Sequence, residues 1–158
     1  MSIKCCAQKI IKNIAGNDTT FYIKSKYYDG VIFPVSYKDT DPKIAFLPSA
    51  NEIKESEISL AKIYNQVNLL GGKYFRNMIV DVSPHFANYK RQYFGYVNDK
   101  GQRVVYINLL NFKNKEDVNK YLTNWKHKFI VGYDGFFEHS MAQFSYNLAT
   151  REIVAGDE

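Results

Sequence analysis

The densest group of chemistry-bearing side chains lies in Asp134-Gly135-Phe136-Phe137-Glu138-His139. Two carboxylates and an imidazole stand within six residues there, next to aromatic side chains. A histidine tuned by a carboxylate serves as a general base, which suits hydrolysis or isomerisation of a small molecule in a pocket. In an extended segment, however, Glu138 and His139 point to opposite faces, so one of them at most reaches such a pocket. We favour a polar hairpin loop and keep catalysis by His139, Glu138 and Asp134 as the alternative hypothesis.

A second candidate is the basic and aromatic string Tyr89-Lys90-Arg91-Gln92-Tyr93, taken together with Lys126-His127-Lys128. If the two segments meet in the folded chain, they form an anion-binding patch in which Arg91 contacts a phosphate or carboxylate while Tyr93 stacks. The competing interpretation, which we favour, is a solvated strand edge whose basic residues discourage edge-to-edge association.

Nucleic-acid binding is the weakest hypothesis. The string Tyr93-Phe94-Gly95-Tyr96-Val97 matches only in part the aromatic strand with which RNA-recognition domains stack on bases. Tyr93 stands where that motif has Gly, and Asp99 stands where its last aromatic residue belongs. The net charge of +5 mildly favours anionic partners, but a packed core strand explains the string better.

Metal and cofactor sites have no support in the spacing of the residues. His85, His127 and His139 lie in separate segments, and no Gly-rich phosphate loop is present. Cys5 and Cys6 are adjacent and are the only cysteines, so we expect no disulfide framework. We expect neither a metal nor a cofactor.

Lysines at positions 4, 9 and 12 interrupt the apolar residues at the N-terminus. The continuous apolar core of a signal peptide is therefore missing, and no other stretch is apolar enough to span a membrane. We expect a cytoplasmic protein if Met1 is the native start, and an exported or periplasmic one if a preceding segment was removed.

The elements that must position these residues begin with a short amphipathic helix over residues 1–16. Strands are expected at 19–23 and 31–36, joined around Asp29-Gly30. The main helix is expected at 49–70, because Ser49 and Glu52 form a capping-box pattern and an apolar stripe follows.

A central hairpin is expected at 92–110, with Gly101 taking the positive φ that its turn requires. A short helix at 116–125 and strands at 74–82, 129–133, 141–146 and 152–154 complete the pattern. This order predicts a single α+β domain over 1–158, a curved antiparallel sheet packed against one long helix. The cystatin-like and NTF2-like folds share this plan.

Several strings carry a family resemblance: Phe46-Leu47-Pro48-Ser49, Tyr89 to Asn98, Val105-Tyr106-Ile107-Asn108, Asp134-Gly135 and Tyr146 to Thr150. Together they resemble a group of small uncharacterised proteins from Bacteroidetes-type bacteria, many of them exported or lipid-anchored. The resemblance covers roughly the last two thirds of the chain. It implies no activity and no catalytic residues, and this chain departs from it at Leu109-Leu110, where we expect a Cys.

The functional hypothesis is a non-enzymatic binding domain that uses an aromatic sheet face or its rim. Its candidate binding residues are Tyr93, Tyr96, Tyr106, Arg91 and Lys90. Both faces of the hairpin are apolar, so one takes the long helix and the other needs the N-terminal segment, a partner protein or a second copy in a homodimer. A protein inhibitor of the immunity type fits. An NTF2-like pocket enzyme or small-ligand binder is the alternative, and a weak binder of anions or nucleic acid is the third.

Overall fold

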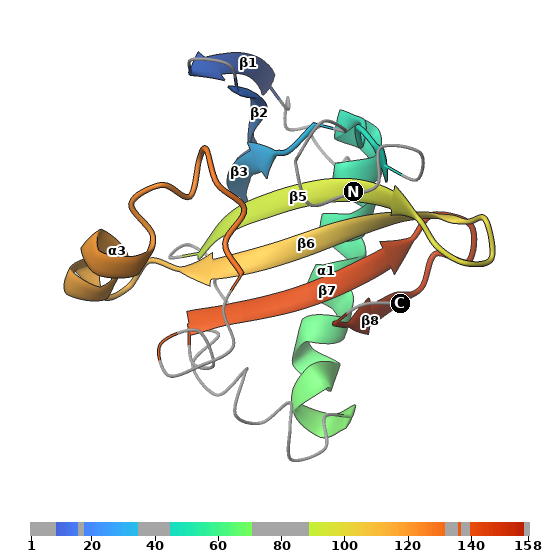
Figure 1. The fold of residues 1–158 in the computed structure, drawn as a ribbon. Coiled ribbons are helices and arrows are strands. Elements are labelled where there is room, and N and C mark those ends of the chain that lie inside the picture. The colour runs from blue at the N-terminus through green and yellow to red at the C-terminus, as the bar shows by residue number, and fades with distance from the viewer. Residues whose placement is uncertain are drawn as a thin grey trace.

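The computed structural model of the chain describes residues 9–15, 18–34, 45–70, 89–131, 136 and 140–156. These residues form an α+β fold around one twisted sheet, shown in Figure 1. Along the sheet the strands are β1 (Lys9–Ala15), β2 (Asp18–Lys24), β3 (Asp29–Ile32), β5 (Tyr89–Val97), β6 (Arg103–Asn111), β7 (Met141–Asn147) and β8 (Ile153–Ala155). The short β4 (Ala45–Phe46) also pairs with β5. The described helices are α1 (Ala50–Leu70) and α3 (Lys115–Tyr121).

The α+β class is confirmed, but the expectation of a wholly antiparallel sheet is wrong. β3 and β5 pair in parallel, with Val31 opposite Gln92, whereas the other pairs of described strands are antiparallel. The long connection between β3 and β5, which contains β4 and α1, makes this parallel pairing possible. The cystatin-like and NTF2-like plans stay predictions.

The expected N-terminal helix over residues 1–16 is wrong for its described part, because Lys9–Ala15 forms β1. This strand pairs with β2 along its whole length, from Lys9 opposite Lys24 to Ala15 opposite Asp18. Ile10, Ile11 and Ile14 are β-branched and favour a strand once a partner is present. Residues 1–8, with Cys5 and Cys6, lie outside the described residues.

The turn between β2 and β3 lies earlier than expected. Ser25 makes it: its Oγ accepts from the backbone N–H groups of Tyr27 and Tyr28, both at 3.1 Å. Gly30 is therefore inside β3, where a Cβ would lie 2.5 Å from the carbonyl oxygen of Arg91. A glycine is needed there because the two parallel strands and the Arg91 and Tyr93 side chains crowd this point.

The main helix begins where its capping box predicts. The backbone N–H of Ser49 donates to Glu52 Oε2 at 2.8 Å, and the N–H of Glu52 donates back to Ser49 Oγ at 3.3 Å. Glu52 also pairs with Arg103 of β6 at 2.8 Å. The box thus fixes both the start of α1 and its position on the sheet.

The central hairpin is confirmed, with β5 and β6 paired from Tyr89 opposite Asn111 to Val97 opposite Arg103. Gly101 has the expected positive φ of 74°. The strand expected at 129–133 is wrong for its described part, since 129–131 is not extended into the sheet. Ile130 donates its N–H to the side chain of Gln92 at 2.8 Å instead of to a neighbouring strand. The segments 74–82 and 132–133 lie outside the described residues.

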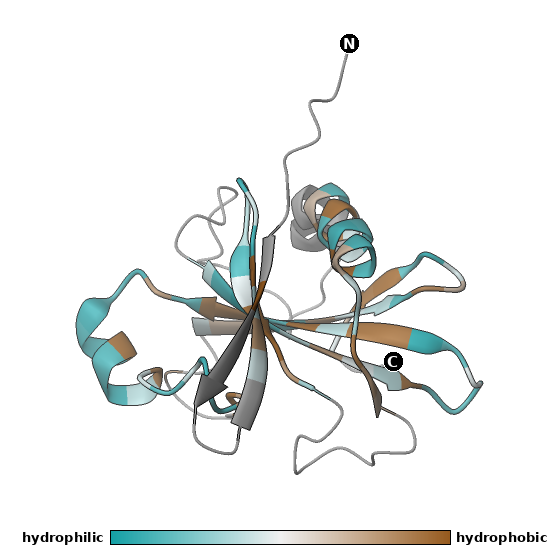
Figure 2. Cartoon of the chain, turned by 90° about the horizontal axis from the view of Figure 1, so that it is seen from above, coloured by the Kyte–Doolittle hydropathy of each residue, from teal (hydrophilic) through white to brown (hydrophobic). Residues whose placement is uncertain are grey.

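Each face of the sheet is covered by a different part of the chain, and Figure 2 shows from above the long helix that lies on one of them. Helix α1 lies on one face, where Ile53 and Leu60 form one hydrophobic core with buried side chains of the strands. Residues 112–131, which we call the cover segment, lie on the other face. Their buried members are Leu122, Trp125, Phe129 and Ile130. Residues of the chain itself therefore cover this face, a cover that was not among those expected, and the partner protein and the homodimer stay predictions.

Candidate functional site

The aromatic residues expected to bind a partner lie inside the molecule. Tyr93 is fully buried under α1, and Tyr106 is 5% exposed under the cover segment. Tyr106 stacks on Phe94, with ring centroids 4.8 Å apart, and Phe129 of the cover segment meets Phe94 edge-on at 5.2 Å. Tyr96 is partly buried, and its hydroxyl lies 3.5 Å from Ser145 Oγ. The aromatic rings of the hairpin therefore build the core and leave little surface for a ligand.

Arg91 also points inward and is 1% exposed. It contacts Glu57 of α1, with Nε to Oε1 at 3.3 Å, and donates to the carbonyl oxygen of Tyr89 at 2.7 Å. The Tyr93 hydroxyl donates to the same Glu57 oxygen at 2.7 Å. A buried polar group between sheet and helix is thus formed by Arg91, Glu57 and Tyr93. In it the guanidinium binds a side chain of α1 rather than an external anion.

The protonation of this buried group follows from its surroundings. Burial is the largest influence on Arg91 and by itself lowers its pKa, but the Glu57 carboxylate and other neighbours more than offset it, so the pKa of Arg91 is raised. Burial, followed by the charge of Glu57, raises the pKa of Tyr93 well above 10.0. Arg91 therefore stays charged and Tyr93 stays neutral across the physiological range.

Lys90 points to the opposite face, because side chains alternate along a strand. Its Nζ lies 2.7 Å from Asp29 Oδ2, which also accepts from the Tyr22 hydroxyl at 2.8 Å. Lys24 stands opposite Asp29 in the strand ladder. Lys126 of the cover segment lies over the Tyr22 ring, 5.6 Å from its centroid. We call these five residues the Tyr22 cluster; it holds three lysines and one carboxylate.

The two basic strings of the sequence therefore do meet, at Tyr22 and at Gln92. Gln92 Nε2 donates to the carbonyl oxygens of Trp125 at 2.6 Å and Lys128 at 2.8 Å. Arg91 and Tyr93 point inward and Lys90 pairs with Asp29, so the anion-binding patch stays a hypothesis. Burial, then the hydrogen bond and charge of Asp29, raise the pKa of Tyr22 from 10.0 to about 12, so Tyr22 is neutral there.

Gln92 and Asn108 are structural residues that the sequence analysis missed. Both are fully buried, and Asn108 Nδ2 donates to Gln92 Oε1 at 3.1 Å and to the carbonyl oxygen of Ile130 at 2.9 Å. Together they hold the cover segment on the sheet by hydrogen bonds to its backbone. Their signal in the sequence is an amide at an inward position of each of two adjacent apolar strands.

Asp134, Glu138 and His139 lie outside the described residues, but Phe136 and Ser140 of the same segment are described. These two line a surface hollow of about 590 Å³, together with residues of the β6–α3 connection. The described residues of the lining are Asn111, Lys113, Asn114, Lys115, Asp117, Phe136 and Ser140. We call it the rim hollow.

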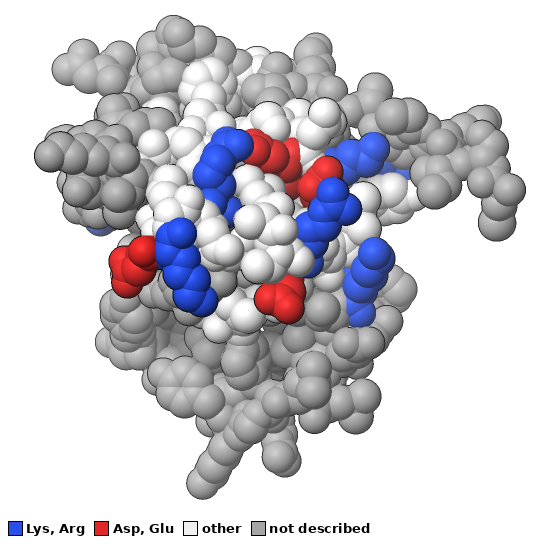
Figure 3. Space-filling view, turned by 90° about the vertical axis from the view of Figure 1, so that its right-hand side faces the viewer, with Lys and Arg blue, Asp and Glu red and all other residues white. Residues whose placement is uncertain are grey.

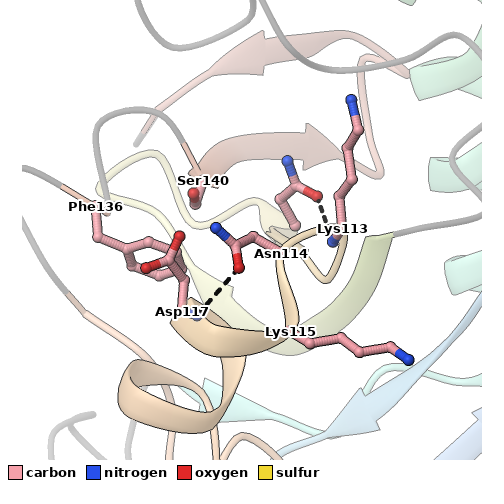
Figure 4. A pocket seen from close by; sticks show the side chains of 7 residues that line it. Lys113, Asn114, Lys115, Asp117, Phe136 and Ser140 are labelled. Atoms are coloured by element: carbon pink, nitrogen blue, oxygen red, sulfur yellow. Dashed lines mark hydrogen bonds between the residues drawn. The ribbon is translucent and has the colours of Figure 1, made fainter.

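Figure 4 shows the arrangement of the rim hollow. Asn114, Asp117, Phe136 and Ser140 lie around one space, whereas the side chains of Lys113 and Lys115 extend away from Phe136. Asn114 caps α3, with its Oδ1 accepting from the N–H groups of Glu116 at 3.0 Å and Asp117 at 3.4 Å. The first amides of this helix are thus already satisfied within the chain.

Charge is distributed unevenly over the chain. The cover segment carries five lysines against Glu116 and Asp117, a net charge of +3 out of +5 for the whole chain. All five lysines are exposed, and none forms an ion pair with a described acidic residue. Figure 3, which looks at the side that carries the β5–β6 turn, shows acidic and basic side chains interspersed.

Among the described residues, no three His, Cys, Asp or Glu side chains gather closely enough to hold a metal ion. Within the same residues, no helix has the length and apolar character needed to cross a membrane. Comparison with protein-family models, curated proteins and solved structures finds no match to this chain. The resemblance to small Bacteroidetes-type proteins accordingly stays a prediction.

Proposed function

We propose that the chain is a non-enzymatic binding domain that recognises an acidic protein surface through the exposed side of its cover segment. The single observation that carries this proposal is the double role of that segment. Its apolar side chains close the aromatic face of the sheet, while its five lysines face solvent without a described acidic partner. The proposed interaction surface is therefore the exposed side of the cover segment and not the aromatic rings named in the sequence-based hypothesis.

The charge pattern supports an acidic partner over other protein surfaces. Residues of α1, on the opposite face, carry three glutamates and two lysines, a net charge of −1. A molecule with one basic side orients and accelerates its encounter with an acidic surface, and salt weakens this effect. The Tyr22 cluster extends the basic surface of the cover segment to β2 and β5.

A protein partner is favoured over nucleic acid because of where the aromatic rings lie. Single-stranded nucleic acid is bound by stacking on exposed rings in a basic groove. The rings of Phe94, Tyr106 and Phe129 instead contact one another under the cover segment.

Two matched charge variants test the proposal. The first replaces Lys120, Lys126 and Lys128 by Glu, and the control replaces the exposed Lys54, Lys62 and Lys100 by Glu. Fluorescence anisotropy at several salt concentrations follows binding of labelled poly-L-glutamate, with a single-stranded oligonucleotide of equal charge as the competing probe. We expect salt-sensitive binding of polyglutamate that the first variant loses and the control retains.

Three results would overturn the proposal. Equal loss in both variants would mean that only total charge matters, since both change it by the same amount. Tighter binding of the oligonucleotide, abolished by the first variant, would support the nucleic-acid hypothesis instead. Absence of polyglutamate binding at the lowest salt concentration would leave the cover segment without the proposed role.

A further inference from the structure

We propose that the Tyr22 cluster is the anchor point of the acidic partner, where Lys24 and Lys126 bind a carboxylate side chain of that partner. This inference rests on the proposed function and names the part of the basic surface that binds an acidic side chain most strongly. The cluster brings together β2, β3, β5 and the cover segment, which are far apart in the sequence.

The carboxylate that belongs to the cluster is already bound within the chain. Asp29 Oδ2 accepts from Lys90 Nζ at 2.7 Å and from the Tyr22 hydroxyl at 2.8 Å. Lys24 and Lys126 are exposed, and neither forms an ion pair with a described acidic residue. Three lysines against one carboxylate leave the cluster with a net charge of +2, so it attracts a further carboxylate.

Lys126 is held in place by two aromatic rings. Its Nζ lies 5.6 Å from the centroid of the Tyr22 ring and 5.6 Å from that of the Trp125 ring. Lys120 of the same segment lies instead over the ring of its own neighbour Tyr121, which does not attach it to the sheet. A side chain that is already ordered loses less conformational entropy on binding, so Lys126 contributes more to affinity than a freely moving lysine.

The strand register gives a second indication of an anion at this place. Lys9 of β1 stands directly opposite Lys24 of β2. Like charges at opposite positions of an antiparallel pair destabilise it. A carboxylate bound beside Lys24 offsets this repulsion, and we therefore place the anchor at this end of β2 rather than over α3.

Two aspartate variants of equal charge test the anchor. Asp29→Asn removes the carboxylate of the cluster, and Asp99→Asn removes an exposed carboxylate at the β5–β6 turn. Fluorescence anisotropy at low salt measures the affinity for labelled hexa-L-glutamate. We expect Asp29→Asn to bind roughly two- to fivefold more tightly than the wild type, the range of one exposed charge pair, and Asp99→Asn to bind like the wild type.

A second pair of variants tests the role of the ring without changing any charge. Tyr22→Leu removes the ring under Lys126, whereas Tyr22→Phe keeps it. Affinity for hexa-L-glutamate should fall roughly two- to fivefold in Tyr22→Leu relative to Tyr22→Phe, the size of an exposed cation–π contact. Chemical denaturation of both variants confirms that they are folded under the conditions of the titration.

The anchor is overturned if Asp29→Asn and Asp99→Asn change the affinity equally, or if Tyr22→Leu binds as tightly as Tyr22→Phe. Either result leaves the proposed function standing as long as the variant with Lys120, Lys126 and Lys128 replaced still loses polyglutamate. Absence of binding to hexa-L-glutamate and to polyglutamate would overturn both. Displacement of hexa-L-glutamate by inorganic phosphate, but not by acetate at equal concentration, would assign the cluster to phosphate groups instead.

Discussion

Arg91 shows how the face of a strand determines the burial of a side chain and the partner that it contacts. Lys90 and Arg91 are neighbours in the chain, yet Lys90 meets Asp29 near the surface and Arg91 meets Glu57 in the interior. A buried charge is tolerated only with a partner, because removing it from water costs more than an isolated ion can recover. At the residue scale, Glu57 is therefore the side chain on which the attachment of α1 depends.

Replacing Glu57 by Ala should destabilise the fold strongly. It leaves the Arg91 guanidinium and the Tyr93 hydroxyl without their shared acceptor, a change that costs about 3 kcal/mol or more at buried sites. Chemical denaturation measures the free energy of unfolding. The control is Glu55→Ala on the exposed side of α1, expected to change stability by less than about 0.5 kcal/mol. Equal effects of the two variants would contradict the buried pairing.

Tyr22 gives the molecule a pH dependence in alkaline solution. Its pKa is raised from 10.0 to about 12, so the folded chain holds a proton that the unfolded chain has already lost. Unfolding then releases a proton, and the stability from Tyr22 is complete below pH 10.0 and lost as the pH rises through about 12.

Titration of tyrosinate absorbance should show a late-titrating phenol in the wild type that is missing in Tyr22→Phe. Asp29→Asn should move this titration to lower pH but not fully to 10.0, because burial is the largest cause of the shift and remains. Loss in Tyr22→Phe of a phenol that titrates near pH 10.0, with the titration near pH 12 retained, would contradict the cluster geometry.

At the scale of elements, the cover segment is the part of the fold that matters most for function. Its short helix α3 has an N-cap and no buried residues of its own. The chain beyond α3 is held by Gln92 and Asn108, whose amides take the place of a neighbouring strand. The segment is thus attached by a few buried hydrogen bonds and an apolar underside.

Gln92→Leu should loosen the cover segment. The substitution leaves the N–H of Ile130 and the carbonyl oxygens of Trp125 and Lys128 without their partner, at a cost of roughly 3 kcal/mol. Trypsin should then cleave faster after Lys126 and Lys128 than in the wild type. Gln102→Leu, at a half-buried position of the β5–β6 turn, is the comparison variant, and an equally fast cleavage there would argue against the role of Gln92.

Local signals in the sequence predicted α1 and the central hairpin. The elements that were predicted wrongly depend on long-range contacts. Ser49 with Glu52, and Gly101, act within a few residues of the element they define. The strand at Lys9–Ala15 depends on pairing with β2, which the helical spacing of its isoleucines does not reveal.

The candidate site was predictable only in part. Strand alternation already separates Lys90 from Arg91, so the inward direction of Arg91 could have been inferred. That Lys126 reaches Tyr22 depends on a contact across more than a hundred residues, and no spacing rule reports it.

At the scale of the whole molecule, the two faces of the sheet differ in what covers them and in charge. Helix α1 brings a slightly acidic layer, and the cover segment brings a basic one. Because both layers bury the aromatic residues beneath them, the described fold has no need of a second copy to protect its sheet.

We therefore expect a monomer in place of the homodimer of the sequence-based hypothesis. Light scattering over a dilution series at moderate salt should give the mass of one chain, 18.3 kDa, at every concentration. A stable dimer that dissociates when Phe94 or Tyr106 is replaced by a charged residue would show that the sheet face is shared between copies.

The most direct test of the central claim, that the cover segment closes the aromatic face, is the fluorescence of Trp125, the one tryptophan of the chain. Trp125 is 7% exposed and contacts Phe112 edge-on. We expect blue-shifted emission that acrylamide quenches weakly, with strong quenching only after unfolding. Emission and quenching in the native protein that equal those of the denatured chain would contradict the account.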